Sequence, residues 1–183
     1  MASKREIALL HERRAAQLIE EGCSGFDEAQ EHLDNALSIW SGYKQSDLMA
    51  RTWCLKGCCS GKAGDYAKAS ASFKRAQHLA ERADDAMLAV TAMINRAICE
   101  IQIGDAKGAA TSSRRAFVKA QTEGGSQMTF LAHVIRAVSY QMAGNFLAAC
   151  NEHEAAAMLA AVADNFNPEP RLALAMDINQ GIR

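Results

Sequence analysis

A short turn motif that returns every 40 residues constrains the fold of this chain more than any other feature. Gly64-Asp65-Tyr66 is followed one period later by Gly104-Asp105-Ala106 and two periods later by Gly144-Asn145-Phe146, and Ser24-Gly25-Phe26 stands one period earlier. A fixed period of this length indicates stacked repeats, in which each unit buries its apolar face against its neighbours. Alanines hold the same register beyond the turn, at Ala36, Ala76, Ala116 and Ala156.

The composition favours an all-α fold. Of the 183 residues, 49% are hydrophobic but only 6% are aromatic, and there are two prolines. A chain rich in alanine and poor in β-branched runs is expected to form helices that approach one another closely. Ser3 and Glu6 have the spacing of a capping box at the start of the first helix. We expect helices at residues 3–21, 26–40, 48–62, 66–83, 86–103, 106–121, 127–143 and 146–163, with a ninth at 168–180.

These helices form pairs, which predicts one domain over residues 1–183. The four repeats span approximately residues 3–43, 44–84, 85–125 and 126–165, and no low-complexity linker separates them. The helix at residues 168–180 has no partner. Because the ends of a stack must be covered, we expect it to act as a C-terminal capping helix.

Charge and cysteine content exclude several classes of function. The net charge is −1, so no overall field attracts nucleic acid or an acidic membrane, and no apolar run has the length of a membrane span. The N-terminus lacks a secretory signal, which predicts a reducing, cytoplasmic location in which all six cysteines are free thiols. Cys54, Cys58 and Cys59 form the densest cysteine group, but no second knuckle accompanies them, so we expect buried thiols and no zinc.

The second repeat resembles a known family. Trp53-x3-Gly57, followed by Gly64-Asp65-Tyr66-x2-Ala69-x3-Phe73-x2-Ala76, resembles the tetratricopeptide repeat. The period exceeds the usual value of about 34 residues, and in this it is similar to the long repeats of kinesin light chains and of adaptors that orient the mitotic spindle. The resemblance implies a right-handed α-solenoid of antiparallel helix pairs that serves as a protein–protein interaction scaffold or adaptor.

In that family the first helix of each pair lines a concave groove. The corresponding residues here are apolar, and a groove of this kind would bind a peptide or an amphipathic helix. The alternative is that the same residues form ordinary core, since periodicity does not distinguish the two. The predicted groove residues are Leu18, Cys54, Cys58, Ile94, Ile98, Ile101, Val134 and Val138.

A second ladder is basic. Lys56, Arg96 and Arg136 are one period apart, and stacking would align them along one edge, where they could attract an acidic or phosphorylated segment. Alternatively, each cation pairs locally, as Arg96 could with Glu100 one helical turn away.

The sequence contains no phosphate-binding glycine loop, nucleophile elbow or metal-ligand motif, so we expect neither an enzyme nor a bound cofactor. His133 and His153 occupy register positions that face the core in this family, which favours a structural role. A regulatory protein that responds to a peptide or small ligand, and a self-assembling oligomer, remain the alternatives to a scaffold.

Overall fold

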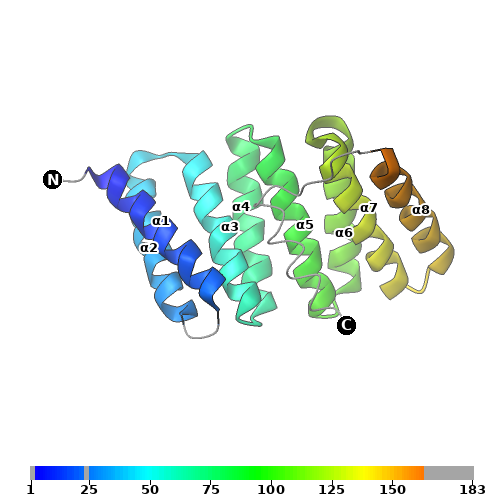
Figure 1. Ribbon diagram of the computed structural model, residues 1–183, viewed down its shortest axis with the longest axis horizontal. Coiled ribbons are helices and arrows are strands. Elements are labelled where there is room, and N and C mark those ends of the chain that lie inside the picture. The colour runs from blue at the N-terminus through cyan, green and yellow to red at the C-terminus, as the bar shows by residue number, and fades with distance from the viewer. Residues whose placement is uncertain (1–2, 23–24, 163–183) are drawn as a thin grey trace.

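Helices packed side by side in chain order make up the part of the chain described by the computed structural model, residues 3–22 and 25–162 (Figure 1). Each helix contacts the next along the chain. The first helices of successive pairs also contact one another, α1 with α3, α3 with α5 and α5 with α7. The elements are α1 (Lys4–Glu21), α2 (Phe26–Tyr43), α3 (Ser46–Lys62), α4 (Tyr66–Arg82), α5 (Ala86–Gln102), α6 (Ala106–Lys119), the π-helical turn η1 (Ala120–Gly124), α7 (Gly125–Met142) and α8 (Phe146–Val162).

The expected α-solenoid of antiparallel helix pairs is confirmed. α1 pairs with α2, α3 with α4, α5 with α6, and α7 with α8, so each expected repeat contains one pair. The helix expected at residues 168–180 lies outside the described residues. Within the described part, no helix is both long and apolar enough to cross a bilayer.

The repeated turn has a local physical cause. Gly64, Gly104 and Gly144 have φ angles of 82°, 77° and 73°, which a side chain would strain. The carboxylates of Asp65 and Asp105 then accept hydrogen bonds from backbone N–H groups three residues on, at 3.1 and 2.9 Å. Each turn thus ends one helix and caps the next.

Small residues set how closely the helices approach. Ala69 and Ala109 are completely buried where the two helices of a pair meet. Gly57 lies against Phe73, and a Cβ atom added at Gly57 would stand 2.7 Å from the ring carbon Cε1. Close packing of the apolar core therefore requires small residues at the helix contacts as well as large side chains between them.

A buried polar contact joins the first pair to the second. The Glu12 carboxylate, 6% exposed, accepts a hydrogen bond from Trp40 Nε1 at 3.0 Å and another from the Thr52 hydroxyl. These residues belong to α1, α2 and α3. The contact therefore ties three helices together through one side chain.

The connection between α6 and α7 differs from the expected one. The sixth helix ends as an α-helix at Lys119 rather than at residue 121, and η1 leads directly to Gly125, whose φ angle is 71°. The Thr129 hydroxyl donates to the carbonyl of Ala120 at 3.2 Å across this junction. A π-helical turn widens the backbone locally, so this junction is built differently from those that precede it.

Candidate functional site

Seven of the eight predicted groove residues recur at two equivalent positions of the first helices, and Ile101 lies outside both sets. Cys54, Ile94 and Val134 are 40 residues apart, as are Leu18, Cys58, Ile98 and Val138. Since α1, α3, α5 and α7 contact their successors, the two sets form rows along the solenoid. These rows are apolar throughout.

Burial varies strongly along these rows. Ile94 and Ile98 are each 1% exposed and belong to the large apolar cluster around α5, while Leu18 and Cys58 are 5% and 3% exposed. Cys54, Ile101, Val134 and Val138 are only partly buried. The accessible part of the predicted groove is therefore formed by these last four residues, and whether a partner binds there remains a prediction.

Each cation of the basic ladder has an acidic neighbour. Lys56 pairs with Asp34, and Arg96 Nε lies 2.8 Å from Glu100 Oε1, the local pair that the sequence allowed. Arg136 Nη2 lies 3.1 Å from Glu152 Oε1. Each of the three cations is thus paired with a carboxylate of this chain. To bind a further anion, the protein would need additional donors near them.

Hollows lie between successive repeats, and each contains one cation of the basic ladder. One hollow lies between α2 and α3 and includes Lys56, another between α4 and α5 includes Arg96, and a third between α6 and α7 includes Arg136. Their volumes are about 330, 530 and 380 Å³. The ladder therefore contributes one cation to each junction between repeats.

The charge of these junctions changes along the solenoid. The position occupied by Asp34 in the first repeat is occupied by Lys74 in the second and Arg114 in the third. Asp34 neutralises Lys56, whereas Lys74 lines the same hollow as Arg96, and Arg114 the same hollow as Arg136. Opposite charges at the first junction are thus replaced by like charges at the next two.

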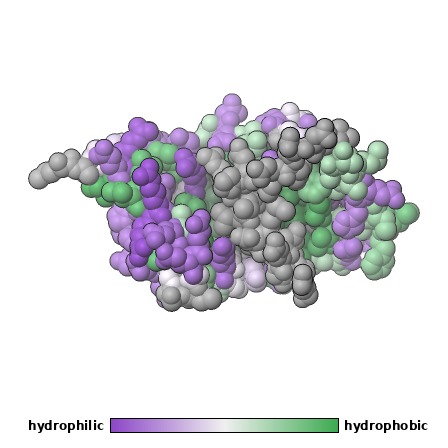
Figure 2. Space-filling model, viewed as in Figure 1, coloured by the Kyte–Doolittle hydropathy of each residue, from purple (hydrophilic) through white to green (hydrophobic). Residues whose placement is uncertain are grey.

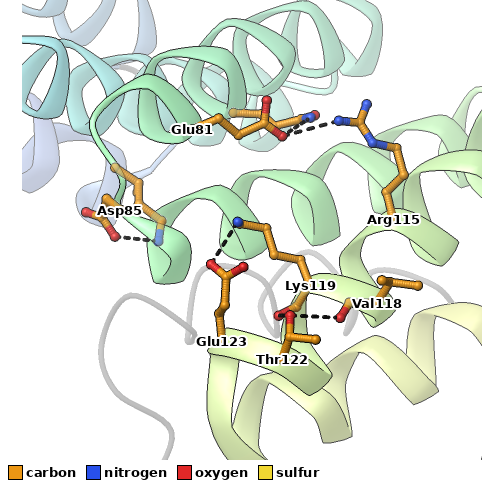
Figure 3. A network of polar contacts seen from close by, with 9 residues as sticks. Glu81, Asp85, Arg115, Val118, Lys119, Thr122 and Glu123 are labelled. Carbon is orange, nitrogen blue, oxygen red and sulfur yellow. Dashed lines mark hydrogen bonds and ion pairs between the residues drawn. The ribbon is translucent and has the colours of Figure 1, made fainter.

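A network of ion pairs occupies the edge formed by α4, α6 and η1 (Figure 3). Glu81 accepts from Arg115 Nη2 at 3.2 Å and from Gln77 Nε2 at 2.9 Å, and Lys119 Nζ lies 2.9 Å from Glu123 Oε2. A hollow of about 470 Å³ lies beside these groups. Glu81 and Glu123 offset Arg115 and Lys119 there, and the remaining charge is that of Arg114, which also lines the hollow between α6 and α7.

The described cysteines are chemically quiet where they are buried. Burial raises the pKa of Cys58 and of Cys99 to about 12, and it raises the pKa of Cys54 well above its ordinary value. Cys59, which is fully buried, also has a raised pKa because of burial. Thiols in this state are poor nucleophiles and poor metal ligands. In residues 3–22 and 25–162, no cluster of three or more His, Cys, Asp or Glu side chains could hold a metal ion.

The histidines occupy three different environments. His133 is half-buried, with Nδ1 2.7 Å from Glu152 Oε2 and its ring packed edge-on against Phe117, as expected for a structural role. His153 is exposed, contrary to the expectation from its register, because the described part of the chain has no helix pair after α8. His11 and His32 meet with their Nδ1 atoms 2.7 Å apart, which the sequence did not suggest.

Large apolar side chains are exposed at the far end of the described solenoid. Phe146, Leu147 and Met158 of α8 are 68%, 76% and 72% exposed. On the face shown in Figure 2, hydrophilic residues gather over α1–α3, whereas apolar residues mixed with hydrophilic ones cover α7 and α8. An exposed patch of several large apolar side chains commonly marks an interaction surface.

Sequence reasoning missed Lys107, Arg114 and Tyr140 as functional candidates. All three line the hollow between α6 and α7 together with Arg136. The available signal was the change from Asp34 to Arg114 at equivalent positions. This change can be interpreted only when the structure shows which ladder residue lies opposite it across the junction.

Comparison with solved structures supports the architecture. The chain is similar to the crystal structure of BtubC (BKLC) from P. vanneervenii, with a TM-score of 0.79 and 18% identity over 93% of this chain and 69% of that one. The fold is that of a helical repeat protein. The chain is also similar to the apo form of RapI, with a TM-score of 0.81 and 12% identity over 99% of this chain and 54% of that one, so it spans about half of RapI's length. No protein-family model and no curated protein sequence matches this chain.

Proposed function

We propose that this protein is a non-catalytic interaction module, a scaffold or adaptor of tetratricopeptide type that binds a peptide or amphipathic helix along its concave side. The observation that carries the proposal is the pair of apolar rows on the first helices, in which Cys54 and Val134 stay partly exposed at equivalent positions of α3 and α7. An apolar helix face laid on such rows would supply affinity by removing its surface from water.

The remaining features of the chain agree with a binding role in the cytoplasm. The buried thiols have raised pKa values because of burial, which suits a structural function in a reducing compartment. Stacked repeats stabilise one another through neighbouring pairs, and such stacks offer extended surfaces for contact with a partner.

The test uses peptides selected for binding to the wild-type chain from a library of random 16-residue sequences. Val134→Glu with Val138→Glu places two charges in the proposed groove. Val118→Glu, at a side chain 58% exposed on α6, is the matched control. We expect the double variant to weaken peptide binding by tenfold or more, since each buried charge costs several kcal/mol, and the control to bind as the wild type does. Equal binding by all three folded proteins would refute the groove.

Self-assembly is a second candidate function, and the exposed apolar residues of α8 favour it. Two copies joined through Phe146, Leu147 and Met158 would bury surface that is now open to water. Light scattering should then give a molar mass above that of the single chain, and Leu147→Glu with Met158→Glu should return it to the monomer value. A monomeric wild type at high concentration would exclude this function.

A further inference from the structure

We propose that the hollow between α6 and α7 is an anion site that binds a phosphate monoester. Its walls carry Lys107 and Arg114 from α6 and Arg136 and Tyr140 from α7, and none of its lining residues is acidic. The volume of about 380 Å³ accommodates a phosphate group together with the side chain or small molecule that carries it. This site is independent of the concave groove proposed above.

Two of the cations are available. In the described part of the chain, Lys107 and Arg114 form no ion pair and no side-chain hydrogen bond, and both are exposed. The neighbouring Arg115, in contrast, is paired with Glu81. Lys107 and Arg114 therefore present a full positive charge to the hollow.

The third cation is held in a fixed orientation. The Arg136 guanidinium stacks over the Phe117 ring at 4.0 Å from its centroid, and Nη2 contacts both Glu152 Oε1 at 3.1 Å and Tyr140 Oη at 3.2 Å. The donors on Nε and Nη1 have no acceptor among the described residues. A guanidinium fixed in this way loses little side-chain entropy when it binds an anion.

The polarity of the lining also favours an acceptor-rich ligand. The hydroxyls of Thr111, Ser113 and Ser139 donate to helix carbonyls, at 2.9, 3.3 and 2.8 Å. Tyr140 accepts from Arg136, so its own O–H is free to donate. The free donors are thus three cations and one phenol. They match a dianion with three acceptor oxygens better than a single carboxylate.

The first junction provides an internal comparison. There the hollow contains Lys56 and Lys68 together with Asp27 and Asp65, and Asp34 pairs with Lys56. The charges at that junction are balanced by this chain's own carboxylates. At the α6–α7 junction Glu152 offsets one cation of three, which leaves two positive charges for an anionic ligand to neutralise.

The experiment follows backbone amide shifts by NMR while inorganic phosphate, or an acetyl-Gly-phosphoserine-Gly amide, is added at constant ionic strength. Lys107→Gln with Arg114→Gln removes the two available cations at exposed positions. Arg13→Gln with Arg51→Gln makes the same change in net charge at exposed positions outside the hollow. Arg114→Asp copies the acid of the first junction into the third, where it can pair with Arg136.

We expect saturable shifts in α6 and α7 with the wild type, and a loss of affinity of about tenfold or more in Lys107→Gln with Arg114→Gln and in Arg114→Asp. The control pair should change affinity less than about twofold. Binding of the phosphopeptide alone identifies a phosphorylated protein as the source of the group. Binding of inorganic phosphate alone identifies a small phosphate compound. The proposal is overturned if neither probe gives saturable shifts at this junction. It is also overturned if the control double variant loses as much affinity as Lys107→Gln with Arg114→Gln.

Discussion

Gly57→Ala offers a direct test of how the helix pairs interlock. In an exposed part of a helix, exchanging glycine for alanine stabilises the fold by about 1 kcal/mol. At Gly57, however, the new Cβ would lie 2.7 to 2.8 Å from three carbons of the Phe73 ring. Carbon atoms in contact are normally about 3.5–4.0 Å apart, so the ring would have to move by roughly 1 Å.

The ring has little room to move. Phe73 is 0% exposed and packs in one apolar cluster with Cys58, Ala69 and Cys99. Overpacking of this kind typically costs about 1–3 kcal/mol, and the tight site places the cost near the upper value. After the helix-propensity gain is subtracted, we expect a net loss of about 2 kcal/mol and a fall in Tm of about 4–8 °C.

The assay is thermal and urea unfolding followed by circular dichroism, with two companion variants. Gly42→Ala lies in α2, where an added Cβ meets nothing within 4 Å, so we expect it to stabilise the protein slightly. In a Phe73→Leu background the ring is absent, and Gly57→Ala should cost much less there. The reasoning is refuted if Gly57→Ala is as stable as the wild type, or if its cost is the same in both backgrounds.

Further predictions concern the small residues and the thiols. Ala69→Leu and Ala109→Leu should each destabilise by about 1–3 kcal/mol in the same assay, since both alanines are fully buried, and an unchanged Tm would contradict the repeat register. Stability should fall as pH rises above 9.0, because unfolded thiols ionise there whereas Cys58 and Cys99 keep their protons until about pH 12. Each of these two thiols should lower the free energy of unfolding by about 1.4 kcal/mol per pH unit in this range. Cys58→Ala or Cys99→Ala should therefore reduce the slope of the unfolding free energy against pH, measured by urea unfolding at successive pH values. Denatured, unreduced protein should react with six equivalents of a thiol reagent, and a chelator should leave the unfolding midpoint unchanged; a stoichiometric zinc ion would contradict this.

Features determined by local chemistry were predictable from the sequence. The capping box of Ser3 and Glu6 forms as expected, and Asp85 caps α5 by accepting from the Leu88 N–H at 2.9 Å. The glycine turns follow from the need for positive φ. Helix boundaries therefore differ from expectation by only a few residues, apart from the π-helical turn after Lys119.

Features that depend on neighbouring helices were not predictable. Ile94 and Val134 share a register position, but one is 1% exposed and the other only partly buried, because their surroundings differ while their spacing does not. Similarly, the hollow of Lys107, Arg114 and Arg136 arises from two helix faces that meet across a junction. The spacing of residues in the sequence describes one helix at a time. It does not predict how the charges of two neighbouring helices balance where their faces meet.

The buried Glu12 contact has a consequence for how the stack is assembled. Faces built from alanine are smooth and similar to one another, so one helix pair could dock against the next a full turn out of place at modest cost. A shifted first pair would separate the Glu12 carboxylate from the Thr52 hydroxyl of α3, while the Trp40 indole, which belongs to the same pair as Glu12, would move with it. Loss of a hydrogen bond to a charged group costs about 1.5–3 kcal/mol. The contact made by this one acidic side chain thus favours a single alignment of the first pair on the second, which the alanine-rich surfaces alone would not specify.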